Sequence, residues 1–505
     1  MNASRRLFLK QATALPGLGA AAPLALNLSA MGSAAAQSAS DYKALVCVFL
    51  YGGNDSMNMV LPTDAASWAN YTAVRNQAPD SIALMAPGTP SLTSATAGSP
   101  ARLGGVLPIT PARAQGRSFA LHPVMGTLQA MFNDDKRLAI VPNVGPLLMP
   151  TTKAQYADVN FPKPANLFSH NDQANFWQAF QPEGAKRGWG GMMADLMAAQ
   201  NDHAVFSAIS TSGNAVWLSG DTVRQYQVGA NGAVRMGTSG SNDNVYGYPA
   251  VGAALRNIVR NSRGTNPLER DLADMHARSM DTEASLRSAL KDATHPLFGT
   301  PGAALDPKLA YTSPLSGGAT LNPLAQQLQT VARMIDACRS GAIGARRQVF
   351  FVSLGGFDTH DLQNRAHAEL FAKLAHGMRY FDDTLAAMGL QGQVTSFTAS
   401  DFGRSFTSNG DGTDHGWGAH HFVMGGAVKG GDLYGNFPVL GARNPNTNYF
   451  DSSPDQVGNG ALLPTTSVDQ LAATLAKWFG LSDSDALRLF PHLRNFSQRD
   501  LGFMA

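Results

Sequence analysis

The sequence lacks most of the features that mark a specialised class of protein. Its 505 residues include only two cysteines, Cys47 and Cys338. Two are too few for a disulfide framework, although a single bridge in an oxidising compartment stays open. A formal net charge of +2 gives no electrostatic basis for binding nucleic acid. No internal repeat or coiled-coil heptad is present. The 44% apolar content is that of a globular protein, and 51 glycines with 28 prolines predict many loops.

The first forty residues have the pattern of an export signal rather than of a folded segment. Ser4–Lys10 matches the twin-arginine motif at nearly every position, and Ala34–Ala36 offers a cleavage site of small residues. Pro16 and Pro23 interrupt the apolar stretch, so we expect no stable membrane span. We therefore predict a signal peptide and linker over 1–40, with the twin-arginine translocase as the partner in export. The location is then periplasmic or extracellular.

Helical and apolar segments alternate in the second half of the chain, which is typical of parallel β–α–β units. Helical periodicity over 324–339 and 366–388 leads in each case into an apolar run, Gln348–Leu354 and Gln393–Thr398. We therefore predict a single α/β domain over 41–505. It should contain a largely parallel central sheet, helices on both faces and long loop insertions.

Aspartates follow three apolar runs of this predicted sheet. Asp55 follows the run at 44–50, Asp358 and His360 follow the second run, and Asp401 follows the third. The carboxyl ends of strands line the reaction crevice of open α/β sheets, so these side chains should meet there. Carboxylate oxygens and imidazole nitrogens together suit a divalent metal. Any one of these aspartates alone would be explained as a turn residue or helix cap.

A glycine-rich loop after Asp401 adds more groups of the same chemistry. It carries Asp414, His415, His420 and His421. Neighbouring histidines cannot all reach one metal, so we expect one or two ligands here, with His415 and His420 as the candidates. The remaining residues would orient the ligands.

Two further residues have the chemistry of ester hydrolysis. Ser169 stands at a predicted helix start, where the positive backbone potential favours an alkoxide, and it is the candidate nucleophile. The alternative is a simple cap, with His170 on the surface. Arg404 has a planar fork suited to an anionic substrate oxygen, and the alternative is a structural Arg–Asp pair.

The order of these motifs resembles DUF1501, a family of exported bacterial proteins of unknown function. The resemblance covers nearly the whole chain after the leader. It rests on the twin-arginine motif and on Gly52–Asp55, Ser169–His170, Gly356–His360, Ser400–Arg404, Asp414–Gly416, Trp478–Leu481 and Leu501–Phe503. That family looks related to the alkaline phosphatase and sulfatase superfamily, whose members bind divalent metals at strand ends.

The resemblance implies an alkaline-phosphatase-like domain and an exported, metal-dependent hydrolase of phosphate or sulfate esters. It implies zinc, calcium, magnesium or manganese as the metal, and a small anionic ester or polymer as the substrate. The implied ligands are Asp55, Asp358, His360, Asp401 and His415 or His420, with Ser169 in the nucleophile region.

Two departures from the superfamily pattern favour a rival function. Phe402 stands where the superfamily has histidine, and Asp358 and His360 are two residues apart instead of the usual four. The rival is a non-catalytic exported protein that keeps the fold for binding or for assembly of a surface component.

Overall fold

A computed structural model describes residues 42–505 except for 231, 234–244, 246, 262–263, 301–304 and 342. These residues belong to one compact unit that runs from Asp41 to Ala505. The predicted export signal, including its two arginines, lies outside the described residues. Within the described part of the chain, no helix combines the length and the apolar character needed to cross a bilayer.

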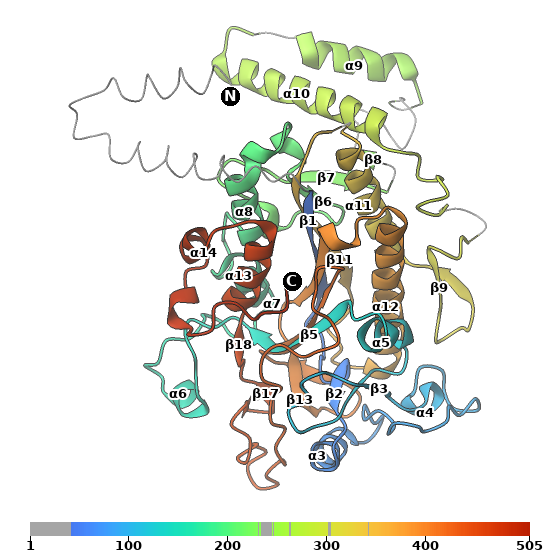
Figure 1. Cartoon of the computed structure of the whole chain (residues 1–505), viewed down its shortest axis with the longest axis vertical. Helices are drawn as coiled ribbons and strands as arrows, with labels where there is room; N and C mark the ends of the chain where they lie inside the picture. The colour runs from blue at the N-terminus through green and yellow to red at the C-terminus, as the bar shows by residue number, and fades with distance from the viewer. Residues whose placement is uncertain are drawn as a thin grey trace, which may run out of the picture. The chain divides into compact units, whose positions relative to one another are not determined.

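A nine-stranded sheet forms the centre of the unit, in the order β18-β5-β15-β12-β1-β11-β6-β7-β8 (Figure 1). In chain order the strands are β1 Lys43–Tyr51, β5 Leu138–Gly145, β6 Ala208–Ser210, β7 Tyr226–Gly229, β8 Gly232–Ala233, β11 Arg347–Gly355, β12 Val394–Ser400, β15 Ala419–Met424 and β18 Thr466–Ser467. The neighbours of β1, strands β11 and β12, both run parallel to it. Strand β15 is antiparallel to both β12 and β5, and β8 is antiparallel to β7. The predicted α/β class with a largely parallel sheet is confirmed.

Helices cover both faces of this sheet (Figure 1). They are α3 Ala65–Arg75, α4 Pro100–Leu103, α5 Gly126–Asn133, α6 Lys153–Ala157, α7 His170–Ala179, α8 Trp189–Met197, α9 Pro249–Asn261, α10 Pro267–Ala289, α11 Pro323–Arg339, α12 Gln363–Ala387, α13 Val468–Phe479 and α14 Asp483–Leu489. Short 3₁₀ turns are η1 Ala198–Gln200, η2 Ala204–Phe206, η3 Val216–Leu218, η4 Gln391–Gln393 and η5 Leu493–Asn495.

The core has two layers, one on each face of the sheet, and the side chains of β1 alternate between them. Val46 and Val48 pack into the cluster that contains residues of α5, α11 and α12. Leu45 and Cys47 point the other way, into the cluster with residues of α8 and α13. Successive side chains of a strand face opposite sides of the sheet, so a run that is apolar at every position predicts burial on both faces. Cys47 and Cys338 are both free thiols.

Small sheets and loops surround the carboxyl ends of the central strands. They are β2 Val60–Pro62 with β4 Phe119–Leu121 and β3 Leu107–Ile109, β9 Ala310–Thr312 with β10 Ala319–Leu321, β13 Arg404–Ser408 with β14 Thr413–His415, and β16 Gln456–Val457 with β17 Ala461–Leu462. The pair β13–β14 follows β12 directly and brings His415 back opposite Arg404.

Candidate metal centre

The polar residues that follow three central strands lie at one edge of the sheet. Because β1 pairs in parallel with β11 and β12, Tyr51 lies beside Gly355, and Leu50 lies beside Ser400. The loops that follow β11 and β12 carry Asp358 and Asp401. The predicted meeting of these two loops at one edge is therefore seen in the structure.

Helix α7 begins at this edge, and its first residue joins the two loops. His170 Nδ1 lies 2.8 Å from Asp401 Oδ2. His170 Nε2 lies 3.5 Å from Asp358 Oδ2. A single imidazole from a separate helix thus contacts the acidic residues that follow two neighbouring strands.

Three imidazole Nε2 atoms converge on the Asp358 carboxylate. His415 Nε2 is 3.1 Å from His170 Nε2 and 3.0 Å from His360 Nε2. Asp358 Oδ1 is 3.1 Å from His360 Nε2 and 3.5 Å from His415 Nε2. We call His170, Asp358, His360 and His415 the histidine cluster. The side chain of Asp358 is 45% exposed and that of His170 is 33% exposed, so solutes can reach the cluster.

Hydrogen bonds behind the cluster fix the tautomer of His415. Its Nδ1 is 2.7 Å from the carbonyl oxygen of Phe168, and a carbonyl oxygen can only accept. The hydrogen of neutral His415 is therefore on Nδ1, and the lone pair is on Nε2, facing the cluster. Burial lowers the pKa of His415, and the charges of His170 and Arg404 contribute in the same direction, which favours this neutral form.

His170 is oriented in the same manner, by a carboxylate. Asp401 Oδ2 accepts from His170 Nδ1 and from the backbone N–H of Gly52, which is 3.1 Å away. The hydrogen bond to Asp401 is the main cause of a raised pKa for His170. Without a cation, a proton on His170 Nε2 can bridge to the lone pair of His415. Removal of that proton leaves two lone pairs facing each other.

Arg404 holds Asp358 from below and is not available to a substrate. Its side chain is fully buried. The guanidinium donates to Asp358 Oδ1 at 2.5 Å, to the carbonyl of Gly52, and to the carbonyl and hydroxyl oxygens of Thr413. Burial raises the pKa of Asp358, but the hydrogen bond and charge of Arg404 outweigh burial and lower it. The predicted contact between Arg404 and a substrate oxygen is therefore corrected to the alternative, a structural Arg–Asp pair.

Phe402 forms the floor of the cluster. Its ring centroid lies 4.7 Å from those of both His170 and His415. Phe402 is fully buried, and a Cβ on Gly53 would lie 2.3 Å from its ring. Gly53 also has a φ of +83°, which disfavours other residues. Phe402 thus packs against both imidazoles and leaves no room for a further polar side chain beneath them.

The donor set fits a divalent metal. One ligand atom each from His170, Asp358 and His415 can be chosen so that all three lie within 4.8 Å of one another. A histidine ligand commonly donates its other ring hydrogen to a carboxylate or a backbone carbonyl, as His170 and His415 do here. Asp401 Oδ1 is buried and has no hydrogen-bond partner among the described residues. Two nitrogens and an oxygen, with His360 alongside, suit zinc or a related metal.

Asp55 lies outside this cluster, contrary to the predicted ligand set. Its carboxylate is fully buried and pairs with Arg75 of α3 through contacts of 2.5 and 3.0 Å. Gln363 also donates to it, at 2.7 Å. Burial raises the pKa of Asp55, but the Arg75 charge and hydrogen bonds outweigh burial and lower it. The guanidinium thus supplies the positive charge that the prediction assigned to a metal.

His420 also departs from the predicted ligand set. It lies within β15, is fully buried, and accepts a hydrogen bond from the backbone N–H of Asn143 at its Nδ1. Its ring packs against Phe437 with centroids 4.5 Å apart. Burial lowers its pKa to about 3, so it stays neutral. His420 is a core residue of the antiparallel strand. Of the three histidines predicted in the loop, only His415 belongs to the cluster.

Ser169 caps α7 instead of presenting its hydroxyl to the cluster. Its Oγ accepts from the backbone N–H of Asp172 and donates to the Asp172 carboxylate at 2.8 Å. The next residue, His170, enters the cluster. From the sequence, His170 had no predicted role in the site, and it was placed on the surface only in the alternative in which Ser169 is a cap. A histidine at a predicted helix start was the available indication.

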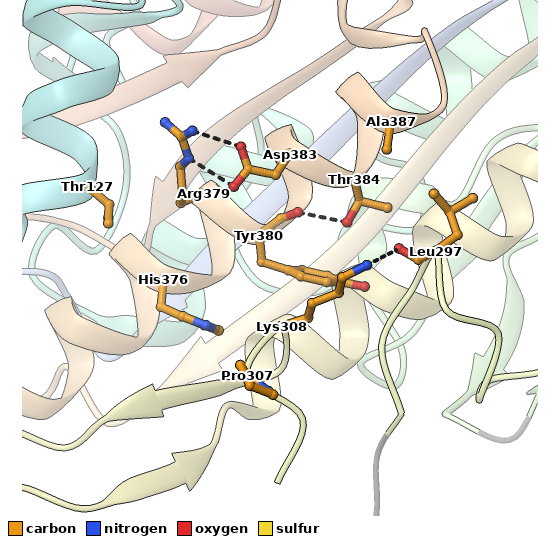
Figure 2. Close-up of a pocket in the computed structure, with 10 residues that line it drawn as sticks. All are labelled: Thr127, Leu297, Pro307, Lys308, His376, Arg379, Tyr380, Asp383, Thr384 and Ala387. Carbon is orange, nitrogen blue, oxygen red and sulfur yellow. Dashed lines mark hydrogen bonds and ion pairs between the residues drawn. The ribbon is translucent and has the colours of Figure 1, made fainter.

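The described pockets are lined by residues outside the histidine cluster. A cavity of about 410 Å³ lies beside the second half of α12. Figure 2 shows Tyr380, Lys308 and His376 among the residues that line it. Lys308 there donates to the carbonyl of Leu297, and Arg379 pairs with Asp383. The side chains of the cluster are between 28% and 45% exposed, and their chemistry distinguishes the site.

Comparisons with known proteins identify a family but no activity. A family model described as "Protein of unknown function (DUF1501)" matches residues 42–489. No curated protein matches the sequence. The predicted family resemblance is thus confirmed.

Several solved structures are similar over most of the chain. One comes from work on glycosaminoglycan metabolism by Bacteroides thetaiotaomicron and is labelled 4S-sulf (TM-score 0.33, 10% identity, 88% of this chain and 74% of that chain). Another is Ps i-CgsB in complex with k-i-k-neocarrahexaose (TM-score 0.31, 8% identity, 90% of this chain and 77% of that chain). A third is the alkaline phosphatase of the Antarctic bacterium TAB5 (TM-score 0.26, 9% identity, 77% of this chain and 93% of that chain). At these TM-scores the likeness carries no argument about activity.

Proposed function

The chain belongs to the DUF1501 family, and we propose that it is an exported, metal-dependent hydrolase of phosphate or sulfate esters. The observation that carries the proposal is the facing pair of imidazole nitrogens. His170 Nε2 and His415 Nε2 lie 3.1 Å apart, while Asp401 and Phe168 engage the opposite nitrogen of each ring. This arrangement presents two lone pairs and the Asp358 carboxylate to a cation.

His170, Asp358 and His415 would hold the metal, with His360 as a further donor or partner. A divalent metal in this place would stabilise the negative charge that develops on the ester oxygens. Asp401 keeps a hydrogen on His170 Nδ1, and Phe168 O keeps one on His415 Nδ1. Arg404 fixes the Asp358 carboxylate, and Phe402 fixes the two rings.

His360 is the residue best placed to move a proton. Its side chain is 44% exposed, and its Nδ1 lies 3.3 Å from Asp414 Oδ1. A hydrogen held on Nδ1 by Asp414 would leave Nε2 as the atom that accepts a proton from water or returns it to a leaving alcohol.

One observation favours the rival, a non-catalytic exported protein that keeps the fold for binding or for assembly of a surface component. Arg404 is committed to Asp358, Thr413 and Gly52, so this nearest arginine cannot receive an anionic ester. Asp358 and Asp414 add negative charge at the exposed edge of the cluster. The two functions differ in a single measurable property, the turnover of an ester by the metal-loaded protein.

Metal analysis tests the site. The purified full chain should contain a stoichiometric divalent metal, measured by plasma mass spectrometry. His170→Ala and His415→Ala should each lose it, whereas His203→Ala, at an exposed position remote in the sequence, should retain it. Full metal content in both cluster variants would remove the site from the proposal.

Hydrolysis of p-nitrophenyl phosphate and p-nitrophenyl sulfate tests the activity. The metal-loaded chain should release nitrophenol from one of them, and His170→Ala should lose at least a hundredfold in rate. A chain that binds metal through His170 and His415 but releases nitrophenol from neither ester would favour the rival.

Export by the twin-arginine translocase is part of the same proposal. It rests on the motif at Ser4–Lys10. Arg5→Lys combined with Arg6→Lys should leave the protein in the cytoplasm. Delivery that continues unchanged in cells without the twin-arginine translocase would contradict it.

A further inference from the structure

Exposed apolar side chains are concentrated on one pair of helices. Fourteen large hydrophobic residues are exposed among the described residues, and seven of them lie between 248 and 275. That segment contains α9 and the first half of α10. Scattered exposed apolar residues need no explanation, but a concentration of this kind marks a contact surface.

The exposed residues form two stripes of equal length. In α9 the stripe is Val251, Leu255 and Ile258, which are 46%, 37% and 63% exposed. In α10 it is Leu268, Leu272 and Met275, which are 78%, 51% and 50% exposed. Both stripes follow the spacing i, i+4, i+7, which places their members on one helix face over about 10 Å.

The two helices are antiparallel and offset, so the α10 stripe is not covered by α9. Arg260, near the end of α9, pairs with Asp281 in the middle of α10 at 2.5 Å. Arg256, one turn earlier, lines a small cavity together with Ala284 and Arg287. Helix α9 therefore lies along the second half of α10, and residues 267–278 extend beyond it, as Figure 1 shows.

We propose that a second copy of this chain covers these stripes through a two-fold contact. In this contact the projecting first half of α10 in each copy packs against α9 of the other copy. The matched spacing lets three apolar residues of one helix meet three of the other. The result is a four-helix bundle built from two identical helix pairs.

The acidic residues of α10 favour α9 over a second α10 as the partner of the α10 stripe. Helix α9 contains Arg256 and Arg260 and no acidic residue. Residues 267–278 contain Glu269, Asp271 and Asp274 against two arginines. Both arginines lie beside α10 of their own chain, so α9 offers a partner no acidic residue. A contact between α9 and the first half of α10 therefore keeps the acidic residues of the two copies apart, whereas α10 against α10 would place them together. The acidic residues beside the α10 stripe would also be repelled by an anionic bilayer.

Solution mass tests the proposal. Light scattering of the full chain at about 50 μM should give twice the chain mass of 53.3 kDa. Leu255→Glu and Leu272→Glu should each shift the protein to monomer with an unchanged circular dichroism spectrum. Val159→Glu, at a residue that is 87% exposed elsewhere, should remain dimeric. A monomeric wild-type chain, or a dimer that survives both stripe substitutions, would overturn the proposal.

Cross-linking tests the pairing of α9 with α10. The native cysteines are buried, so introduced ones will be the reactive ones. A mixture of Leu255→Cys and Leu272→Cys chains should form mixed disulfide dimers faster than either variant alone. Faster cross-linking of either variant with itself would contradict this pairing. A wild-type chain that is monomeric but sediments with phosphatidylglycerol vesicles would identify a membrane as the occupant and overturn the proposal.

Discussion

His170 and His415 face each other through Nε2 atoms 3.1 Å apart, although 245 residues separate them in the sequence. Each ring is held from behind, one by Asp401 and the other by the carbonyl oxygen of Phe168. The two rings stand at 75° to one another, with centroids 4.4 Å apart. Two imidazole lone pairs at this distance can be accommodated by one shared proton or, in the proposed function, by a cation.

Asp401→Asn should weaken metal binding without unfolding the protein. The hydrogen bond from His170 to Asp401 is the largest cause of the raised His170 pKa, so loss of the carboxylate should lower that pKa in the metal-free chain. Loss of such an orienting partner typically costs 10–100-fold in metal affinity. Competitive chelator titration and the NMR titration of His170 measure the two effects. Asp80→Asn, at an exposed aspartate, is the control and should change neither.

Ser169→Ala should act as the loss of a helix cap. Among the residues that the structure describes, the Ser169 hydroxyl bonds only to Asp172 in the first turn of α7. The free energy of unfolding in urea should fall by about 1 kcal/mol, while metal content stays the same. Ser169→Thr keeps the hydroxyl and should restore most of the stability. Loss of all ester turnover in Ser169→Ala with full metal content would return Ser169 to the role of nucleophile.

Arg75→Met should be among the most destabilising substitutions in the chain. It would leave the Asp55 carboxylate charged and fully buried, which typically costs 3–5 kcal/mol. The double variant Arg75→Met with Asp55→Asn should be more stable than Arg75→Met alone, because no uncompensated charge remains. Denaturant unfolding of the wild type, the two single variants and the double variant measures these differences in stability. Asp55→Asn should retain its metal, and loss of the metal would restore Asp55 to the ligand set.

Acid should destabilise the metal-free chain at mildly acidic pH. Burial lowers the pKa of His367 to about 4 and those of His420 and His421 to about 3, and that of His122 also falls well below its usual value. These groups stay neutral in the folded chain, whereas unfolded histidine takes up a proton below about pH 6.5.

Stability falls as the pH falls because the unfolded state takes up protons that these buried histidines do not. Stability contributed by these groups is complete above about pH 6.5 and falls as the pH drops towards 4, by up to about 1.4 kcal/mol per pH unit for each histidine. Urea midpoints between pH 7.5 and 5 should show this decline. His421→Gln should make it shallower, and stability that is flat over this range would contradict the prediction.

The sheet and its polar edge could be predicted from the sequence because both depend on local patterns. The apolar runs at 44–50, 348–354 and 393–398 correspond to β1, β11 and β12 within two residues at each end. Parallel strands place their carboxyl ends together, so an aspartate after each run indicates the edge. Asp358, Asp401 and His360 lie at the edge of the sheet where this rule predicts them.

The pairing of individual side chains could not be predicted in this way. Arg75 lies on a helix 20 residues after Asp55, and no local pattern indicates that its guanidinium neutralises that carboxylate. His420 was assigned to a loop, although the run Ala419–Met424 is apolar enough to form a buried strand. Ser169 and His170 are adjacent, and only the direction of α7 decides which of them faces the cluster.

The wide sequence spacing of the cluster has a consequence for biosynthesis. His170 must meet residues that lie 188 positions later at Asp358, 231 positions later at Asp401 and 245 positions later at His415. A ribosome that has released only the first half of the chain has released a single residue of the cluster, His170. If the proposed metal centre forms, metal capture would have to wait until translation has passed residue 415 and the sheet has closed, so the compartment in which folding finishes would determine which metal is bound.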